Sequence, residues 1–237
     1  METSSQRLLA WCGPVLMAIF FVGIWPIAGF VPPPSPNNSV EQVTSFYAEN
    51  ATTIRLGLYI CMIAAALVAP WVAAITMQLL RIDRPLALVH VILGLCIITW
   101  FVMPLMTFQA AAYRPEAAPE VTYRLNDYGW LLFVGISSTP VLQAFVIALV
   151  IFKDKREVPI FPRWVAYASI WCGLGMAGGG LCVFVKNGPL AWNGVISWWL
   201  LLVAFGTWVL VLSLSLLRYA IPHEEQELAR ESGHASV

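Results

Sequence analysis

The stretch IRLGLYICMIAAALVAPWVAAITMQLL, residues 54–80, decides the fold class of this protein. It carries a single charged residue, Arg55, at its start. A helix needs about 20 mostly apolar residues to cross the hydrocarbon core of a bilayer. Comparable stretches occupy residues 8–31, 86–112, 128–152, 164–185 and 195–219. We therefore predict an all-α polytopic membrane bundle of six transmembrane helices in residues 1–221, followed by a polar cytoplasmic tail in residues 222–237.

The composition agrees with a membrane protein and excludes other classes. Hydrophobic residues make up 59% of the 237 residues and charged residues 11%, and the mean hydropathy is +0.77. Soluble domains carry about 45–50% apolar and ~25% charged residues. The 13 Lys and Arg are balanced by 13 Asp and Glu, so no basic surplus points to nucleic acid as a partner. The first apolar stretch exceeds a signal-peptide core, and we expect an uncleaved anchor.

The positive charges predict the orientation. Alternate loops divide them unequally, and the richer side is cytoplasmic in membrane proteins. Nine fall on one side: Arg7, Arg81, Arg84, Lys153, Lys155, Arg156, Arg163, Arg218 and Arg230. Four fall on the other: Arg55, Arg114, Arg124 and Lys186. Both termini are therefore expected in the cytoplasm.

The first outward loop has its own pattern. Residues 32–36, PPPSP, form a stiff extended segment. Ser39 with Gln42 three residues later is a capping box, and apolar residues follow at helical spacing. We predict a short amphipathic helix over residues 39–49, lying on the outer membrane face.

The middle of the six spans contains no Asp, Glu, Lys or Arg. Ionisable residues at that depth usually mark ion paths or catalytic centres. The polar groups there form a candidate patch: Thr99, Ser137, Ser138, Thr139 and Gln143. Pro140 follows the hydroxyl run, so one interpretation is a kinked helix with interhelical hydrogen bonds, and the other is a patch lining a substrate cavity. His90 is interpreted as structural or snorkelling.

A second candidate site lies at the outer mouth of the bundle. Its members are Arg55, Gln109, Arg124, Asp127, Lys186 and Asn193. These groups either form interfacial ion pairs and helix caps or recognise a polar headgroup. We expect Asp127 to pair with Arg55, Arg124 or Lys186, because a carboxylate beside a span is costly unless it is paired or hydrated.

The fifth span has a face of small residues. Gly175 and Gly179 have the GxxxG spacing that lets helix backbones approach closely. This face predicts tight packing within the bundle, a homodimer seam, or room for a flat hydrophobic ligand. Pro26, Pro70, Pro104 and Pro140 predict kinks in four spans.

Catalytic patterns are absent from the sequence. There is no G-x-S-x-G, H-E-x-x-H or Walker A motif, and the cysteines and histidines do not have metal-ligand spacing. We expect no cofactor and no metal. A membrane enzyme acting on a lipid would need a base, and Asp127 is the one carboxylate placed for that role. The sequence favours a role that is not enzymatic.

Three segments carry a resemblance to other proteins. They are LNDYGW at 125–130, FPRW at 161–164 and GPLAWNG at 188–194. Together they resemble an uncharacterised set of bacterial six-span inner-membrane proteins. The resemblance implies a multi-pass protein of the bacterial plasma membrane and brings no activity.

Two functions compete at this point. The first is a membrane protein that holds a hydrophobic small molecule or lipid, or supports a partner membrane complex. The alternative is a facilitator or transporter of a weakly polar molecule, entering by the outer mouth and passing Thr99 and Gln143. The partners implied are membrane lipid, a hydrophobic ligand, and a second copy or another membrane protein.

Overall fold

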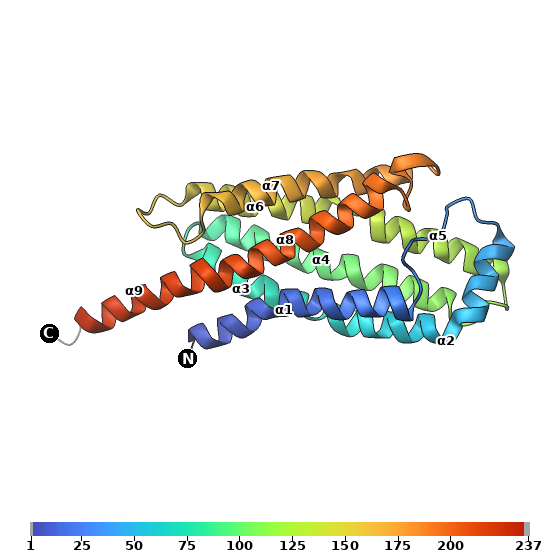
Figure 1. Ribbon diagram of the computed structural model, residues 1–237, viewed down its shortest axis with the longest axis horizontal. Coiled ribbons are helices and arrows are strands. Elements are labelled where there is room, and N and C mark those ends of the chain that lie inside the picture. Colours follow the sequence, from blue (N-terminus) through green and yellow to red (C-terminus); the bar gives the residue numbers. More distant parts are fainter. Residues whose placement is uncertain (1, 235–237) are drawn as a thin grey trace.

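The computed structural model describes residues 2–234 and contains only helices and connections in that range. In chain order the elements are α1 (Glu2–Val22), η1 (Gly23–Ile27), α2 (Val40–Ala65), α3 (Val68–Leu80), α4 (Arg84–Ala111), α5 (Pro119–Gly135), α6 (Ser138–Lys153), α7 (Arg163–Ala177), η2 (Gly178–Val183), η3 (Gly188–Leu190), η4 (Val195–Leu200), α8 (Leu201–Ser215), η5 (Leu216–Ala220) and α9 (Ile221–His234). They form an elongated bundle (Figure 1).

Six helical segments are long and apolar enough to cross a membrane, which confirms the predicted number of spans. They are Thr3–Ile27, Val40–Leu80, Arg84–Ala111, Pro119–Lys153, Arg163–Val183 and Gly188–Ser232. Large apolar side chains face outward along them, including Leu8, Ile92 and Val203, each at least 62% exposed. Exposed apolar surface of this extent suits a hydrocarbon environment.

Prolines locate the breaks in the spans. A proline ring clashes with the carbonyl four residues earlier and removes one helical hydrogen bond. The residues four before Pro26, Pro70 and Pro140 are Val22, Ala66 and Ile136. Val22 is the last residue of α1, directly before the π-helix η1. Ala66 lies in the turn between α2 and α3, and Ile136 lies in the gap between α5 and α6. Pro104 lies inside the continuous α4, so the kink expected there is not a break. The predicted kink of the fourth span is thus a full interruption.

Both termini lie at one end of the bundle, which we name the terminal end; the opposite end is the far end (Figure 1). The nine-residue set of positive charges belongs to the terminal end and the four-residue set to the far end. The structure thus separates the two sets as the sequence predicts.

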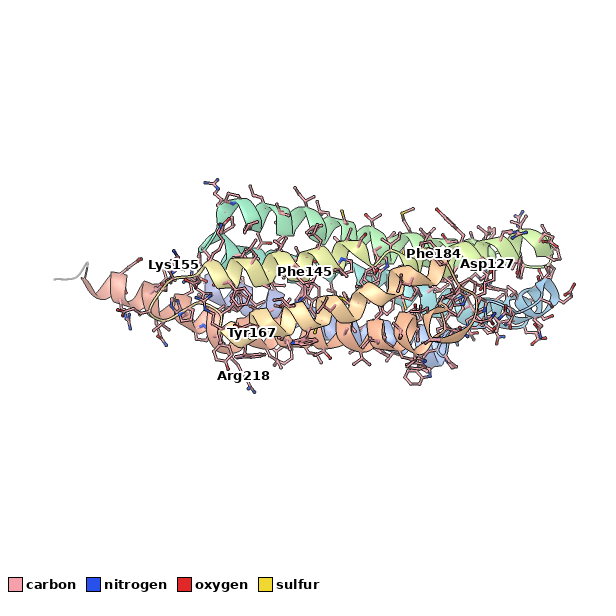
Figure 2. All side chains as sticks on the ribbon, turned by 90° about the horizontal axis from the view of Figure 1, so that it is seen from above. Asp127, Phe145, Lys155, Tyr167, Phe184 and Arg218 are labelled. Atoms are coloured by element: carbon pink, nitrogen blue, oxygen red, sulfur yellow. The ribbon has the colours of Figure 1, made fainter. Side chains whose placement is uncertain are left out.

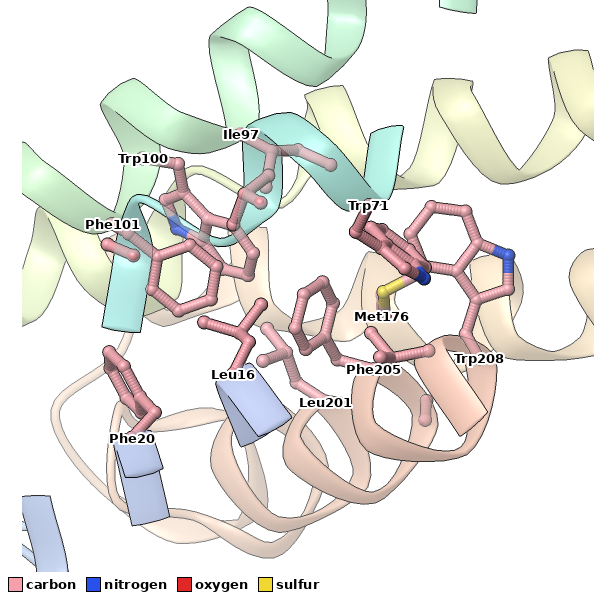
Figure 3. Packing of buried hydrophobic residues seen from close by; sticks show 14 of the residues in the cluster. Leu16, Phe20, Trp71, Ile97, Trp100, Phe101, Met176, Leu201, Phe205 and Trp208 are labelled. Atoms are coloured by element: carbon pink, nitrogen blue, oxygen red, sulfur yellow. The ribbon is translucent and has the colours of Figure 1, made fainter. Parts of the chain in front are cut away.

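The core is aromatic. Trp71 and Trp208 meet edge to face with ring centroids 5.7 Å apart, and Phe20 meets Phe101 at 5.0 Å. Figure 3 shows these rings with Leu16 and Phe205 filling the space between α1, α3, α4 and α8. Aromatic pairs in this geometry add to the dispersion contacts that hold helices together where lipid is as apolar as the core.

The glycine face packs inside the bundle. A Cβ added at Gly175 would lie 2.9 Å from the Cβ of Ala204 on α8, and one at Gly179 would lie 2.7 Å from the carbonyl oxygen of Val134 on α5. Both separations are too short for real atoms. These contacts support the first of the three interpretations, tight packing within the bundle.

The predicted loop helix is not a separate element. Ser39 caps a helix that starts at Val40, and the complete capping box with Gln42 is present. That helix continues without interruption to Ala65, so residues 39–49 are the first turns of the second span. These turns lie across the far end of the bundle (Figure 1). The separate surface helix was wrong because the run from Glu49 to Arg55 contains no helix-breaking residue.

The acidic tail is also more than a solvated extension. From Ile221 the chain continues as α9, whose carboxylates contact α1 and α3. The Arg7 guanidinium holds Glu225 in a bidentate pair with distances of 2.8 and 3.2 Å. Arg81 forms an ion pair with Glu227 and donates to Gln78. The sequence pattern could not show this pairing because its partners are more than 140 residues apart in the chain.

Candidate functional site

The mid-membrane polar patch does not form one site. Thr99 is exposed on the outside of the bundle and donates to the carbonyl of Leu95 in its own helix. Ser138 is also exposed. Ser137 is buried, and its hydroxyl accepts a hydrogen bond of 3.1 Å from the backbone N–H of Gly180. Thr99 and the half-buried Thr139 line a common groove of about 220 Å³ with Trp100 and Ile136, and Ser137, Ser138 and Gln143 are not part of its lining.

Gln143 belongs to a separate buried pair. Its amide nitrogen lies 3.0 Å from both Nδ1 and the carbonyl oxygen of His90, and both side chains are fully buried. His90 is therefore not snorkelling: it joins α4 to α6. A buried polar pair of this kind is an interhelical link in a medium that offers few other partners.

The outer-mouth residues divide into four groups. Gln109 donates a 3.1 Å hydrogen bond to the carbonyl of Arg55, which joins α4 to α2. Arg124 is exposed, with its guanidinium carbon 5.6 Å from the ring centroid of Tyr123. Asn193 is half-buried in the connection between η3 and η4. Asp127 and Lys186 line one cavity, which we name the far-end hollow.

The far-end hollow has a volume of about 150 Å³. Its walls come from α5, η2 and the connections at residues 28–39 and 184–194. They are formed by Pro36, Asp127, Leu131, Cys182, Val183, Phe184, Val185, Lys186 and Trp192. Figure 2 shows Asp127 and Phe184 beside each other toward the far end, away from Lys155. The hollow brings two of the predicted outer-mouth charges to one cavity.

Asp127 does not form the ion pair that the sequence predicted. Among residues 2–234, no basic nitrogen lies within 4.0 Å of its carboxylate. The side-chain amide of Asn126 donates to this carboxylate at 3.5 Å. The pairing prediction was therefore wrong as a direct contact: Arg124 is exposed beside the ring of Tyr123, and Lys186 lines the same hollow without coming within 4.0 Å of the carboxylate.

A buried polar cluster stands behind Asp127. The side-chain oxygen of Asn126 accepts from the Tyr47 hydroxyl at 3.3 Å and from the Trp130 indole at 3.2 Å. Tyr47 and Trp130 are fully buried, and Asn126 is nearly so. Sequence reasoning missed this cluster. The spacing of four between Asn126 and Trp130 was a visible signal, since residues four apart share a helix face.

A second feature that the sequence did not predict is an apolar crevice between α1–η1 and η4–α8. Its lining comprises Met17, Phe20, Phe21, Ile24, Val31, Trp100, Phe101, Phe133, Trp198, Leu201, Leu202 and Phe205. Met17, Phe21 and Leu202 are half-buried and form its rim on the side of the bundle, whereas Phe20 and Phe205 are buried. The crevice therefore opens laterally, where lipid chains would lie.

The size of the crevice limits what can enter. Its volume is about 40 Å³, compared with about 150 Å³ for an apolar cavity that accepts benzene. A ring does not fit, but the end of a hydrocarbon chain does. Two π-helical segments border the crevice: η1, which contains Pro26 and supplies Ile24, and η4, which supplies Trp198.

Comparison with known proteins gives no matching family model, no matching curated protein and no matching solved structure.

Proposed function

We propose that this protein is a multi-pass membrane protein that holds a hydrophobic molecule, namely the hydrocarbon chain of a lipid. The observation that carries the proposal is the laterally open apolar crevice with a half-buried rim of Met17, Phe21 and Leu202. A chain end that enters it exchanges lipid contacts for contacts with a fixed aromatic wall. Each methylene then gains dispersion contacts without the cost of ordering the protein, because the wall is already in place.

A photoreactive lipid tests this proposal. A phospholipid with a diazirine at the chain terminus should label residues 17–24 and 198–205 in the membrane-embedded protein. Met17→Trp should reduce that labelling severalfold by covering the rim, whereas Val15→Trp should not, since Val15 faces outward. Labelling that is spread evenly over all outward faces in the unmodified protein would refute the proposal.

The orientation belongs to the same proposal. We propose that the terminal end is cytoplasmic and that the membrane is a bacterial plasma membrane, supported by the segregation of positive charge and by the resemblance of the segments at 125–130, 161–164 and 188–194. Cysteines introduced as Ser35→Cys and Glu157→Cys report on the two ends. A membrane-impermeant maleimide should label the first in intact cells and the second only after permeabilisation; the reverse pattern would invert the orientation.

Transport is the alternative, and the structure supports it less. The expected route passes Thr99 and Gln143, but Thr99 lies on the outside of the bundle and Gln143 is occupied by His90. A flux of weakly polar solutes into proteoliposomes that is abolished by Gln143→Leu would favour transport over chain binding.

A further inference from the structure

Two residues of opposite charge line the far-end hollow without forming an ion pair. Asp127 and Lys186 both line it, and no basic nitrogen in residues 2–234 reaches within 4.0 Å of the Asp127 carboxylate. Opposite charges this near the boundary of a span normally gain by closing into a pair. Here both residues line a space of about 150 Å³. It leaves room for a ligand that carries both complementary charges.

The carboxylate is held in place from behind. Asn126 presents its amide nitrogen to Asp127 because its oxygen is engaged by Tyr47 and Trp130. Since those two rings are fully buried, the amide cannot turn without breaking both hydrogen bonds. Asn126 is thus a positioning residue, because its fixed amide donates to one oxygen of the Asp127 carboxylate. The remaining lone pairs of that carboxylate are available to a ligand in the hollow.

The two connections that line the hollow are also held in place by hydrogen bonds. Trp192 donates from its indole to the carbonyl of Pro34 at 2.8 Å, which holds the ring against the proline-rich connection. The backbone carbonyl of Lys186 accepts from Asn37 at 3.3 Å. Two connections distant in sequence are thereby tied together beside the hollow. A carboxylate with aromatic rings in the same cavity is the combination that binds organic ammonium groups.

We infer that the far-end hollow binds the headgroup of a zwitterionic phospholipid, with the ammonium group at Asp127 and Trp192 and the phosphate at Lys186. The apolar rim supports a lipid as the source: Phe184 is 80% exposed and Val183 is 53% exposed beside the hollow. The inference rests on the proposed function in that the ligand is a lipid. It does not require the same lipid molecule to occupy the apolar crevice.

Native mass spectrometry of the purified full chain tests this inference. Lipids with identical chains and different headgroups are titrated: phosphatidylethanolamine, phosphatidylcholine and phosphatidylglycerol. The zwitterionic lipids should bind more tightly than phosphatidylglycerol. Asp127→Asn should weaken their binding about tenfold, the value of one charge-assisted contact. Lys186→Gln, at an exposed cation, should weaken all three phospholipids about threefold.

Matched controls separate the site from general charge effects. Glu120→Gln removes a carboxylate from an exposed position of the same helix, and Arg114→Gln removes an exposed cation from the same end. Neither should change the headgroup preference. Thermal unfolding of each variant confirms that it is folded before binding is compared.

The outcomes are distinct. Equal affinity of the unmodified protein for all three headgroups, or an unchanged preference in folded Asp127→Asn, would overturn the inference. If free phosphoethanolamine competes as well as the lipid at the same concentration, the hollow binds a zwitterion, but the claim that this zwitterion belongs to a lipid would be overturned. Headgroup preference that persists in Met17→Trp while chain-terminal labelling is lost would show that the hollow acts independently of the crevice, so the two proposals can fail separately.

Discussion

The two ends of the bundle use their charged side chains in opposite ways. At the terminal end, Arg7, Arg81 and Lys153 each form an ion pair with a carboxylate from another element. At the far end, the carboxylate of Asp127 and the ammonium of Lys186 share a hollow and form no pair within 4.0 Å. Ion pairs between elements thus hold the terminal end together, whereas close helix packing and hydrogen bonds hold the far end.

This difference separates stability from binding. Paired charges at the terminal end join α1, α3 and α9, so their removal should affect folding. Unpaired charges at the far end contribute little to the fold and remain available to a ligand. Four predictions test that division, in order of decreasing effect on stability.

Gly179→Ala should have the largest effect, a destabilisation of about 3 kcal/mol, because its Cβ would lie 2.7 Å from the Val134 carbonyl oxygen and neither backbone can move freely. Unfolding in a denaturing detergent series measures it. Gly206→Ala is the matched control, since its Cβ would meet Met17 at an ordinary 3.5 Å. If the two variants are equally stable, close packing does not hold the far end.

Arg81→Ala should cost about 2 kcal/mol. The Arg81 side chain is 19% exposed, pairs with Glu227 and lies 3.9 Å from the carboxylate of Glu224, which is 18% exposed, so its loss leaves a partly buried carboxylate without its cation. Arg84→Ala, at an exposed position three residues later, should change stability by less than about 0.5 kcal/mol. Equal effects of the two substitutions would show that the network on α9 does not stabilise the bundle.

The terminal end should lose stability in acid. Burial raises the pKa of Asp154, but hydrogen bonds from the backbone N–H groups of Ile160 and Arg156 and the Arg156 guanidinium outweigh it and hold the pKa below the ordinary value. The hydrogen bond from Lys153 likewise lowers the pKa of Asp83. A lowered folded-state pKa stabilises the protein above the unfolded value of about 4, and that stability is lost as the pH falls through the folded pKa.

The measurement is the unfolding temperature between about pH 6 and pH 2.5, a range that spans the ordinary carboxylate pKa. It should fall with decreasing pH, and Asp154→Asn should flatten the profile and cost about 1 kcal/mol at neutral pH. A profile that Asp154→Asn leaves unchanged would assign the acid sensitivity to other groups.

Asp127→Asn should have the smallest effect on stability, within about 0.5 kcal/mol, since no ion pair is lost. Its unfolding temperature at neutral pH, measured without added lipid, should match that of the unmodified protein. A destabilisation comparable to that of Arg81→Ala would mean that the carboxylate supports the fold, and the contrast between the two ends would not hold.

The number of spans, the capping box at Ser39 and the separation of positive charge were predictable because each depends on a local pattern or on alternation along the chain. The interruption of the fourth span at Ile136 was only partly so: Pro140 predicts a disturbance, but whether it bends or breaks the helix depends on neighbours such as Trp100, whose indole donates to the carbonyl of Phe133 at 2.9 Å.

The candidate sites were less predictable because they depend on which side of a helix faces inward. Thr99 and Gln143 are both polar residues within apolar spans, yet Thr99 is exposed and Gln143 is buried. Asp127 and Lys186 meet through a connection whose path the sequence does not specify. The apolar crevice carries no sequence signal at all, since its residues are ordinary apolar residues drawn from six elements and one connection.

The most direct test of chain binding locates the chain itself. Crystals grown in bicelles containing a phospholipid brominated at its chain terminus would carry an anomalous marker. We expect bromine density inside the apolar crevice, against Phe20 and Phe205. Ordered bromine only on the outer faces of the bundle, with the crevice closed by its own side chains, would contradict the account.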